Sequence, residues 1–193
     1  MLRRAGRTVA MAHTAASFSD VSRAADAGLT LSTHLGNSLP AQLHKVENPL
    51  LAQLGEQRLA ACFIADGHHL SPDAVRALVA IKGADRTVLV TDAVTAAAAP
   101  PGRYGFAGMS IESGADGVVR VPGQSNLAGS SLTLDQAVRN IVAWGIANPA
   151  VALRMASSNA RAAIADATAA HGIALPPGRA RWSDDLRLES VAS

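Results

Sequence analysis

The chain has 193 residues, of which 49% are hydrophobic and 17% charged, and its formal net charge at neutral pH is +2. A chain of this length and hydrophobicity can bury a core, which excludes a disordered or highly charged class of protein. Its lysines and arginines are scattered rather than gathered into a stripe with aromatic residues, so the sequence predicts no nucleic-acid surface. It holds no apolar run of the ~18 residues that a membrane span needs, and its one cysteine, Cys62, cannot form an internal disulfide. We therefore expect no membrane segment and a reducing compartment, the cytoplasm.

The N-terminal half repeats one pattern, in which a short apolar run ends in a polar cluster and an amphipathic helix follows. In the first unit, residues 7–12 predict a buried strand that ends at His13, and residues 17–28 predict a helix that terminates at Gly28. The apolar face expected for this helix consists of Phe18, Val21, Ala24 and Ala25. Because a core strand begins so soon after Met1, we also expect that a segment upstream of it is missing.

The second unit predicts a strand that ends at His34 and a helix around residues 48–58, with Pro49 near its start. The third predicts a strand over residues 59–65, followed by a polar cluster that holds Asp66, Gly67, His68 and His69. Its helix, residues 71–83, has Ser71 as N-cap, Pro72 at the first position and Gly83 at the end.

The fourth unit predicts a strand over residues 86–91 that ends at Asp92. Continuous apolar strands alternating with helices indicate a parallel α/β sheet. Polar residues at four successive strand ends favour a closed barrel over a doubly wound sheet, which keeps its site chiefly at one switch point.

The composition of the sequence changes after Asp92. Residues 95–126 are rich in glycine, alanine and proline and predict a mobile loop and short antiparallel strands around an Asp116-Gly117 turn. A helix is predicted from an N-cap at Thr133, with Leu134, Val138, Ile141 and Val142 on its apolar face, and one or two short helices over residues 148–164. The tail from His171 is predicted to be peripheral.

His13 and His34 are candidate metal ligands. A single histidine at a strand end is more often buried and hydrogen-bonded to backbone than bound to a metal. Two of them at equivalent positions on adjacent parallel strands, about 4.8 Å apart, favour convergence on one ion, since zinc and similar ions prefer neutral imidazole nitrogens.

Asp92 is the candidate general base. Burying a carboxylate at the end of a buried strand costs free energy unless the group is paired with a partner or has a catalytic role. The alternative is an N-cap, although the run that follows Asp92 starts a helix poorly. At the third strand end either histidine of the pair is expected to face a substrate, or the cluster is a surface loop with a capping Asp66. His44 is a further residue that could line the mouth of the site, and His171 is expected at the surface.

Residues 127–130 combine small residues with a following helix. Their backbone amides are candidates to reach a ligand, or they form only a tight turn.

Six segments, in this order and spacing, resemble the N-acetylglucosamine-6-phosphate deacetylases of the amidohydrolase superfamily. They are AHT at 12–14, STHLGN at 32–37, FIADGHHL at 63–70, VLVTDA at 88–93, LAGSSLTLDQAVRN at 127–140 and ALRMASSNARAAI at 152–164.

The resemblance implies a metal-dependent enzyme on a (β/α)8 TIM barrel, of which residues 1–170 are the C-terminal half and residues 171–193 a remnant of the small β-domain. The activity implied is hydrolysis of the acetamide of N-acetylglucosamine 6-phosphate, which gives glucosamine 6-phosphate and acetate in cytoplasmic amino-sugar metabolism. It also implies a divalent cofactor, Zn²⁺ first and Fe²⁺ or another ion second, an amino-sugar phosphate as the small-molecule partner, and a homodimer for the full-length form.

The resemblance also implies a role for each site residue. His13 and His34 correspond to the metal-binding histidines, Asp92 to the acid/base and His69 to a substrate-contacting histidine. Asn37 and Ser38 fall where the family contacts the sugar phosphate. Leu127, Ala128 and Gly129 fall on the loop beside the acetyl group.

Three features depart from the family pattern. The family's metal-binding Glu lies upstream of the position of His13, where this chain has no such segment. The family's Arg-Glu-Pro-Gly phosphate motif is replaced by LHKVENP, in which His44 or Lys45 are the available cations. The tail lacks the usual apolar strand. Two alternatives therefore stay open, an inactive or truncated chain that needs an upstream segment, and an amidohydrolase that acts on another N-acyl substrate.

Overall fold

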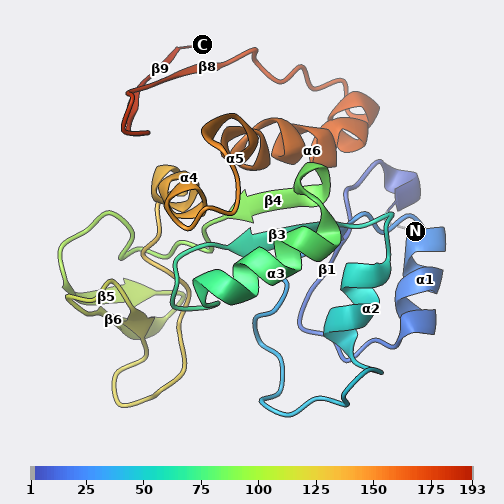
Figure 1. Ribbon diagram of the computed structural model, residues 1–193, viewed down its shortest axis with the longest axis horizontal. Coiled ribbons are helices and arrows are strands. Elements are labelled where there is room, and N and C mark those ends of the chain that lie inside the picture. The colour runs from blue at the N-terminus through green and yellow to red at the C-terminus, as the bar shows by residue number, and fades with distance from the viewer. Residues whose placement is uncertain (1–2, 193) are drawn as a thin grey trace.

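A computed structural model describes residues 3–192. Residues 1–2 and 193, at the outer ends of the predicted regions 1–170 and 171–193, lie outside the described residues. The centre of the structure is a four-stranded parallel sheet in the order β1-β2-β3-β4, which is also the chain order. The strands are β1 (Ala10–Met11), β2 (Leu31–Ser32), β3 (Ala60–Ile64) and β4 (Thr87–Val90). The predicted parallel α/β architecture is confirmed. The carboxyl ends of β3 and β4 point toward a separate lobe that contains β5 (Gly102–Phe106) and β6 (Met109–Ser113) (Figure 1).

A helix follows each of the first three strands, as the sequence predicts: α1 (Phe18–Asp26), α2 (Pro49–Gly55) and α3 (Pro72–Lys82). Ser17 and Asp20 form a capping box at the start of α1. The predicted cap of α3 is confirmed, because the Ser71 side chain accepts a hydrogen bond from the Ala74 amide and Gly83 ends the helix at φ 85°. Phe18, predicted on the buried face of α1, is instead 41% exposed, since it stands at the first turn, beyond the packed residues Val21 and Ala25.

The main hydrophobic core lies around β3. Phe63 and Ile64 are almost fully buried and pack in one cluster with Val75 of α3 and with Val138 and Ile141 of α4 (Leu134–Ala143). A second cluster, formed by Val21, Ala25, Ala52 and Leu59, holds α1 and α2 together.

The first strand differs from its prediction. β1 covers only Ala10–Met11, and Ala10 is exposed while Met11 is half-buried. The expectation of a buried strand over residues 7–12 was wrong because β1 is an outer strand, which among the described residues pairs only with β2.

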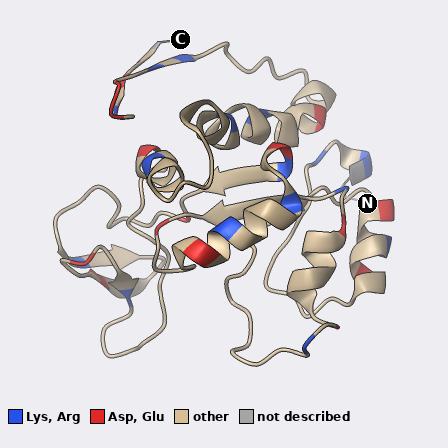
Figure 2. Ribbon diagram, in the orientation of Figure 1, with Lys and Arg blue, Asp and Glu red and all other residues tan. Residues whose placement is uncertain are grey.

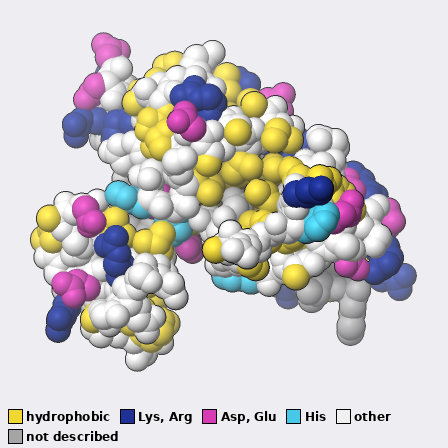
Figure 3. Space-filling model, turned by 60° about the horizontal axis from the view of Figure 1, so that its bottom comes forward, with side chains coloured by type: hydrophobic (Ala, Val, Ile, Leu, Met, Phe, Trp, Pro, Cys, Tyr) yellow, Lys and Arg dark blue, Asp and Glu magenta, His cyan; other side chains and the backbone are white. Residues whose placement is uncertain are grey.

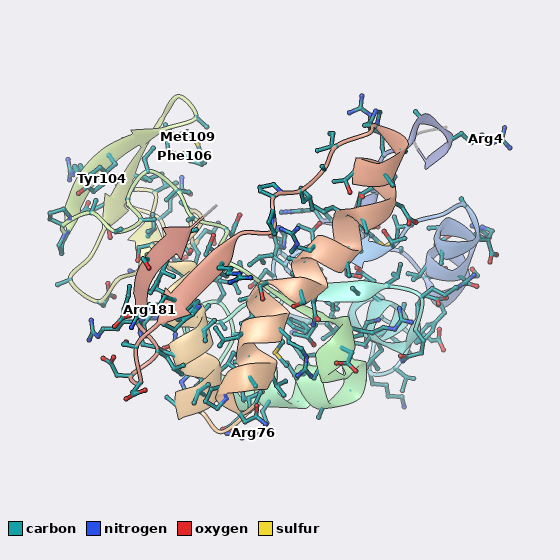
Figure 4. All side chains as sticks on the ribbon, turned by 90° about the horizontal axis from the view of Figure 1, so that it is seen from above. Arg4, Arg76, Tyr104, Phe106, Met109 and Arg181 are labelled. Atoms are coloured by element: carbon teal, nitrogen blue, oxygen red, sulfur yellow. The ribbon has the colours of Figure 1, made fainter. Side chains whose placement is uncertain are left out.

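The segment after β4 forms a second, antiparallel sheet of β5 (Gly102–Phe106), β6 (Met109–Ser113) and β7 (Val119–Arg120). The predicted Asp116-Gly117 turn is confirmed between β6 and β7. Val94, Ala96, Ile111 and Val119 form its small core. Figure 4 shows Tyr104, Phe106 and Met109 on this lobe, apart from the helices.

Three helices and a hairpin complete the fold: α4 (Leu134–Ala143), α5 (Pro149–Ala156), α6 (Ser158–Ala170), β8 (Arg179–Trp182) and β9 (Leu188–Ala192). Thr133 is the N-cap of α4 but makes no side-chain capping hydrogen bond, and Leu134, predicted on the apolar face, is 37% exposed because it is the first residue of the helix. The last helix runs for 13 residues and is longer than predicted.

The tail is only partly peripheral. Trp182 and Leu186 pack against the main core, and Arg139 donates a hydrogen bond of 3.1 Å to the Leu186 carbonyl. Most other residues of the tail are exposed.

Two short 3-10 helices, Arg3–Ala5 and Ala84–Arg86, lie outside the tail. Charges of both signs are spread over the elements (Figure 2). Within residues 3–192, no helix combines the length and hydrophobicity that crossing a membrane requires.

Candidate active site

The predicted chemical residues at three strand ends share an unusual backbone conformation. His13, His34 and Asp92 have φ values of 47°, 27° and 52°, in the left-handed region. Ser38, beside them in the site, has a φ of 56°. Non-glycine residues rarely adopt this region, because the strain costs on the order of 1–3 kcal/mol for each residue. Residues strained in this way cluster at functional sites. The strand ends are therefore held in shape by their surroundings rather than by local preference.

These residues line one cavity of about 720 Å³ at the carboxyl edge of the sheet. Its lining consists of His13, His34, Asn37, Ser38, Leu39, Pro40, His69, Asp92, Asn126, Leu127 and Gly129. Figure 3 shows a deep hollow between the β5–β6 lobe and the rest of that face, with histidine side chains beside it. The fold thus brings together residues from four strand ends and from a loop much further along the chain.

Ala128 is the one predicted site residue that does not line the cavity. Its side chain packs against the small core of the β5–β7 sheet, and its amide donates a 3.0 Å hydrogen bond to the Val119 carbonyl. Because its neighbours Leu127 and Gly129 face the cavity, Ala128 is turned the other way and anchors the loop.

The two histidines converge through their Nε2 atoms, which are 3.1 Å apart, with the rings edge to face. Two nitrogen lone pairs at this distance repel each other unless a proton or a cation lies between them. Two nitrogen ligands at about 2.0–2.1 Å from one tetrahedral zinc ion are about 3.3 Å apart, so the pair fits as two ligands of a shared ion.

The rest of a metal shell is not supplied by the part of the chain that the structure describes. Within it, no three His, Cys, Asp or Glu side chains are grouped so as to hold a metal. Nδ1 of His34 is buried and has no hydrogen-bond partner, although a metal-bound imidazole normally donates its second N–H. The donor set therefore fits a divalent ion in part.

His69 is held by Asp66, a contact that sequence reasoning did not predict. The two side chains are almost completely buried, and Nδ1 of His69 lies 2.6 Å from the Asp66 carboxylate. The other carboxylate oxygen accepts hydrogen bonds from the His68 and His69 amides. Burial alone would raise the pKa of Asp66, but these hydrogen bonds outweigh it and hold the pKa below its ordinary value. An ionised Asp66 fixes the Nδ1–H tautomer and leaves Nε2 of His69 as the free nitrogen.

The other histidines lie outside the cavity lining. His68 is exposed and borders a separate pocket with Gln136 and Asn140. His44 is exposed, and its Nδ1 accepts hydrogen bonds from the Glu47 and Val46 amides, so it stabilises its own loop.

Asp92 is exposed, although β4 itself is buried at Thr87, Val88 and Leu89. The expectation that burial makes this carboxylate costly therefore does not apply. Asp92 is exposed because the chain turns out of the core at the end of β4.

Asn126, Leu39 and Pro40 line the cavity but were not predicted. Leu39 and Pro40 directly follow the predicted Asn37 and Ser38, and Asn126 precedes Leu127, so adjacency was the only available signal. Asn37 also donates from its side chain to the His34 carbonyl at 3.0 Å, which fixes the turn that carries His34.

Comparison with known proteins places the chain among sugar-phosphate deacetylases, although no family model matches it. N-acetylgalactosamine-6-phosphate deacetylase of Escherichia coli O157:H7 is 38% identical over 149 residues, which are 77% of this chain and 39% of that protein. A protein of Escherichia coli (strain K12), provisionally named for the same activity, is 40% identical over 124 residues, or 64% of this chain and 72% of that one.

Among solved structures, a variant of N-acetyl-D-glucosamine-6-phosphate deacetylase from Mycobacterium smegmatis, in complex with N-acetyl-D-glucosamine 6-phosphate, has a TM-score of 0.85 and 28% identity. The match covers 99% of this chain and 51% of that one.

These likenesses define an α/β protein with the amidohydrolase fold. More narrowly, the chain belongs to the family of N-acetylglucosamine- and N-acetylgalactosamine-6-phosphate deacetylases. It spans about two-fifths of the O157:H7 relative and about half of the Mycobacterium smegmatis chain.

Proposed function

We propose that the cavity at the carboxyl edge of the sheet hydrolyses the acetamide of an N-acetyl amino-sugar 6-phosphate, N-acetylglucosamine 6-phosphate first, to the free amine and acetate. The relatives are named for this reaction on glucosamine and galactosamine derivatives. The observation that carries the proposal is the convergence of the His13 and His34 Nε2 atoms, 3.1 Å apart, in the cavity that Asp92 also lines.

His13 and His34 would hold a divalent metal ion, zinc or alternatively Fe²⁺, as two of its ligands. When bound, such an ion lowers the pKa of a water molecule and polarises the amide carbonyl. Catalytic zinc sites normally have three protein ligands, so we expect a further ligand from outside the described residues.

Asp92 is proposed as the acid/base. Its carboxylate accepts a proton from the attacking water and then delivers it to the nitrogen of the leaving amine, so that acetate and a free amine result. Its exposed position on the cavity wall leaves the carboxylate free for both transfers.

The remaining residues bind and orient the substrate. His69, fixed through Nδ1 by Asp66, offers Nε2 to a substrate oxygen. Asn37 and Ser38 contact the sugar phosphate on one side, and Leu127 and Gly129 border the acetyl group on the other, with Ala128 anchoring that loop.

One observation favours a second candidate, an amidohydrolase acting on an N-acyl substrate without a phosphate. Within the described residues, no lysine or arginine lines the cavity. His44, one of the cations considered as a replacement for the family's arginine, is occupied in its own loop. A phosphate would then be bound by Lys45, the other cation of that segment, or by a cation from a neighbouring subunit of a homodimer.

The domain organisation is part of the same proposal. Residues 1–170 would be the C-terminal half of a (β/α)8 barrel, and residues 171–193 a remnant of the small β-domain, in a cytoplasmic protein. The sequential strand order supports the barrel, because a doubly wound sheet reverses its order at a switch point. An inactive chain that needs a further segment is the alternative from outside the enzyme class.

The test combines zinc titration with an assay of acetate release from N-acetylglucosamine 6-phosphate and from N-acetylglucosamine. We expect weak zinc binding and slow turnover by this chain alone, and no zinc binding by the double variant His13→Ala, His34→Ala. Asp92→Asn should abolish turnover while zinc binding persists. Parallel loss of both in Asp92→Asn would make Asp92 a ligand instead, and faster turnover of the unphosphorylated sugar would favour the second candidate. Absence of acetate release from either sugar would support the inactive chain.

A further inference from the structure

Ser130 joins two distant segments that both border the cavity. It follows the lining residues Leu127 and Gly129 and lies beside the end of β4, where it forms a parallel bridge with Ala93. Ser130 is 2% exposed and does not itself line the cavity. Any effect of Ser130 on the chemistry must therefore act through its neighbours.

The hydrogen bonds of Ser130 hold the backbone on both sides of Asp92. Its hydroxyl donates to the Thr91 carbonyl at 2.5 Å, which belongs to the peptide group before Asp92. Its amide donates to the Asp92 carbonyl at 2.9 Å, in the peptide group after it. Because one residue fixes both peptide groups, it sets φ and ψ of Asp92 and so the direction of its Cα–Cβ bond.

Two further bonds make the connection rigid. The Ser130 carbonyl accepts from the Val94 amide at 3.0 Å, and its hydroxyl oxygen accepts from the Leu132 amide at 3.1 Å. Gly129 allows the close approach, since a Cβ there would lie 2.4 Å from Val94 Cγ1 and 3.0 Å from the Asp92 carbonyl oxygen. The left-handed conformation of Asp92, φ 52°, is one that a free loop would not keep.

We infer that Ser130 is a positioning residue, which holds the Asp92 carboxylate and the loop of Leu127 and Gly129 as one unit around the scissile amide. This rests on the role proposed for Asp92. The loop borders one side of the reacting group and Asp92 supplies its proton, so one residue that fixes both sets their separation. Misplacement by about 1 Å of a group that transfers a proton can lower the rate about 100-fold.

The test compares Ser130→Ala with Ser131→Ala. Ser131 is a matched control, because its hydroxyl donates an equally short bond of 2.6 Å, but to the Gly117 carbonyl in the β6–β7 turn. We expect kcat for acetate release to fall about 10- to 100-fold in Ser130→Ala, with KM and zinc affinity unchanged, while Ser131→Ala keeps the unmutated kcat. Equal losses in the two variants, a rise in KM alone, or a parallel loss of zinc binding would each overturn the inference.

Amide hydrogen exchange separates this inference from the proposed function. The amides of residue 130 and Val94 should exchange faster in Ser130→Ala and remain protected in Ser131→Ala. If the unmutated chain releases no acetate, the proposed function fails, and exchange still decides, because unchanged protection of both amides would show that the hydroxyl does not hold this backbone. If Ser130→Ala loses its cooperative unfolding transition, Ser130→Cys, of similar shape, replaces it with the same expectations.

Discussion

Lys82 is a buried cation whose removal should destabilise the fold. It ends α3, is 2% exposed, and its Nζ donates to the carbonyls of Gln53, Leu54 and Glu56 at 3.1, 3.4 and 2.7 Å. These carbonyls lie at the C-terminal end of α2, where no amide of the helix can reach them. The ammonium therefore caps the helix that follows the cavity-lining loop.

The size of the effect follows from two opposing contributions in Lys82→Met, which keeps the length of the side chain. Lys82→Met leaves the buried carbonyls of Gln53 and Leu54 without a donor, which costs about 2–6 kcal/mol, whereas the Glu56 carbonyl keeps a 3.2 Å hydrogen bond from the Leu59 amide. Against this, the folded state no longer buries an ammonium, and since burial lowers the pKa of Lys82 from 10.5 to about 8, this returns about 3 kcal/mol. We expect a net loss of up to about 3 kcal/mol at pH 7.

The dependence on pH gives a second test. Between pH 8 and 10.5 the unfolded chain binds more protons at Lys82 than the folded chain, so the stability contributed by this residue rises with pH. The difference in unfolding free energy between the unmutated chain and Lys82→Met should widen over this range by up to about 3 kcal/mol.

Urea unfolding followed by tryptophan fluorescence measures both effects, because Trp144 and Trp182 pack against the main core. Lys45→Met, at an exposed lysine, is the control and should leave the midpoint unchanged. If Lys82→Met is more stable than the unmutated chain at pH 7, the cost of leaving the carbonyls without a donor is smaller than the cost of burying the ammonium, and the prediction is refuted. A gap that narrows above pH 8 would show that the carbonyls raise the pKa more than burial lowers it.

Two further predictions concern residues that shape the cavity. Asp66→Asn should reduce the loss of stability that the unmutated chain shows in acid. Because the pKa of Asp66 is lowered in the fold, its contribution is present above the ordinary value of 3.8 and is lost as pH falls through the folded pKa. Urea midpoints between pH 5 and 3 should fall less in Asp66→Asn than in the unmutated chain, and parallel curves would contradict this. Gly129→Ala should lower the free energy of unfolding by about 2–5 kcal/mol, because the added Cβ would contact Val94 and the backbone φ of +74° is strained for alanine. Gly123→Ala, which has φ +80° and nothing within 4 Å of the added Cβ, should cost only about 1–2 kcal/mol. Equal thermal shifts in these two variants would exclude the contact with Val94 as the cause.

Local chemistry made much of the fold predictable from the sequence. The limits of α3 follow from Ser71, Pro72 and Gly83, and the turn between β6 and β7 follows from Asp116 and Gly117. Each of these signals depends on residues a few positions apart, whose backbone preferences act within one turn. The strand-end placement of His13, His34 and Asp92 was likewise available from the alternation of apolar runs and polar clusters.

The tertiary structure decided what these residues meet. The Asp66–His69 pair, the packing of Ala128 against the small core of the β5–β7 sheet, and the exposure of Ala10 and Asp92 each depend on which segments pack nearby. Ser130 lies 39 positions after Thr91, yet its hydroxyl fixes the backbone there. The sequence by itself determined which chemical groups stand at the strand ends. Only packing between distant segments determined their directions, because burial and hydrogen-bond partners belong to neighbours in space rather than along the chain.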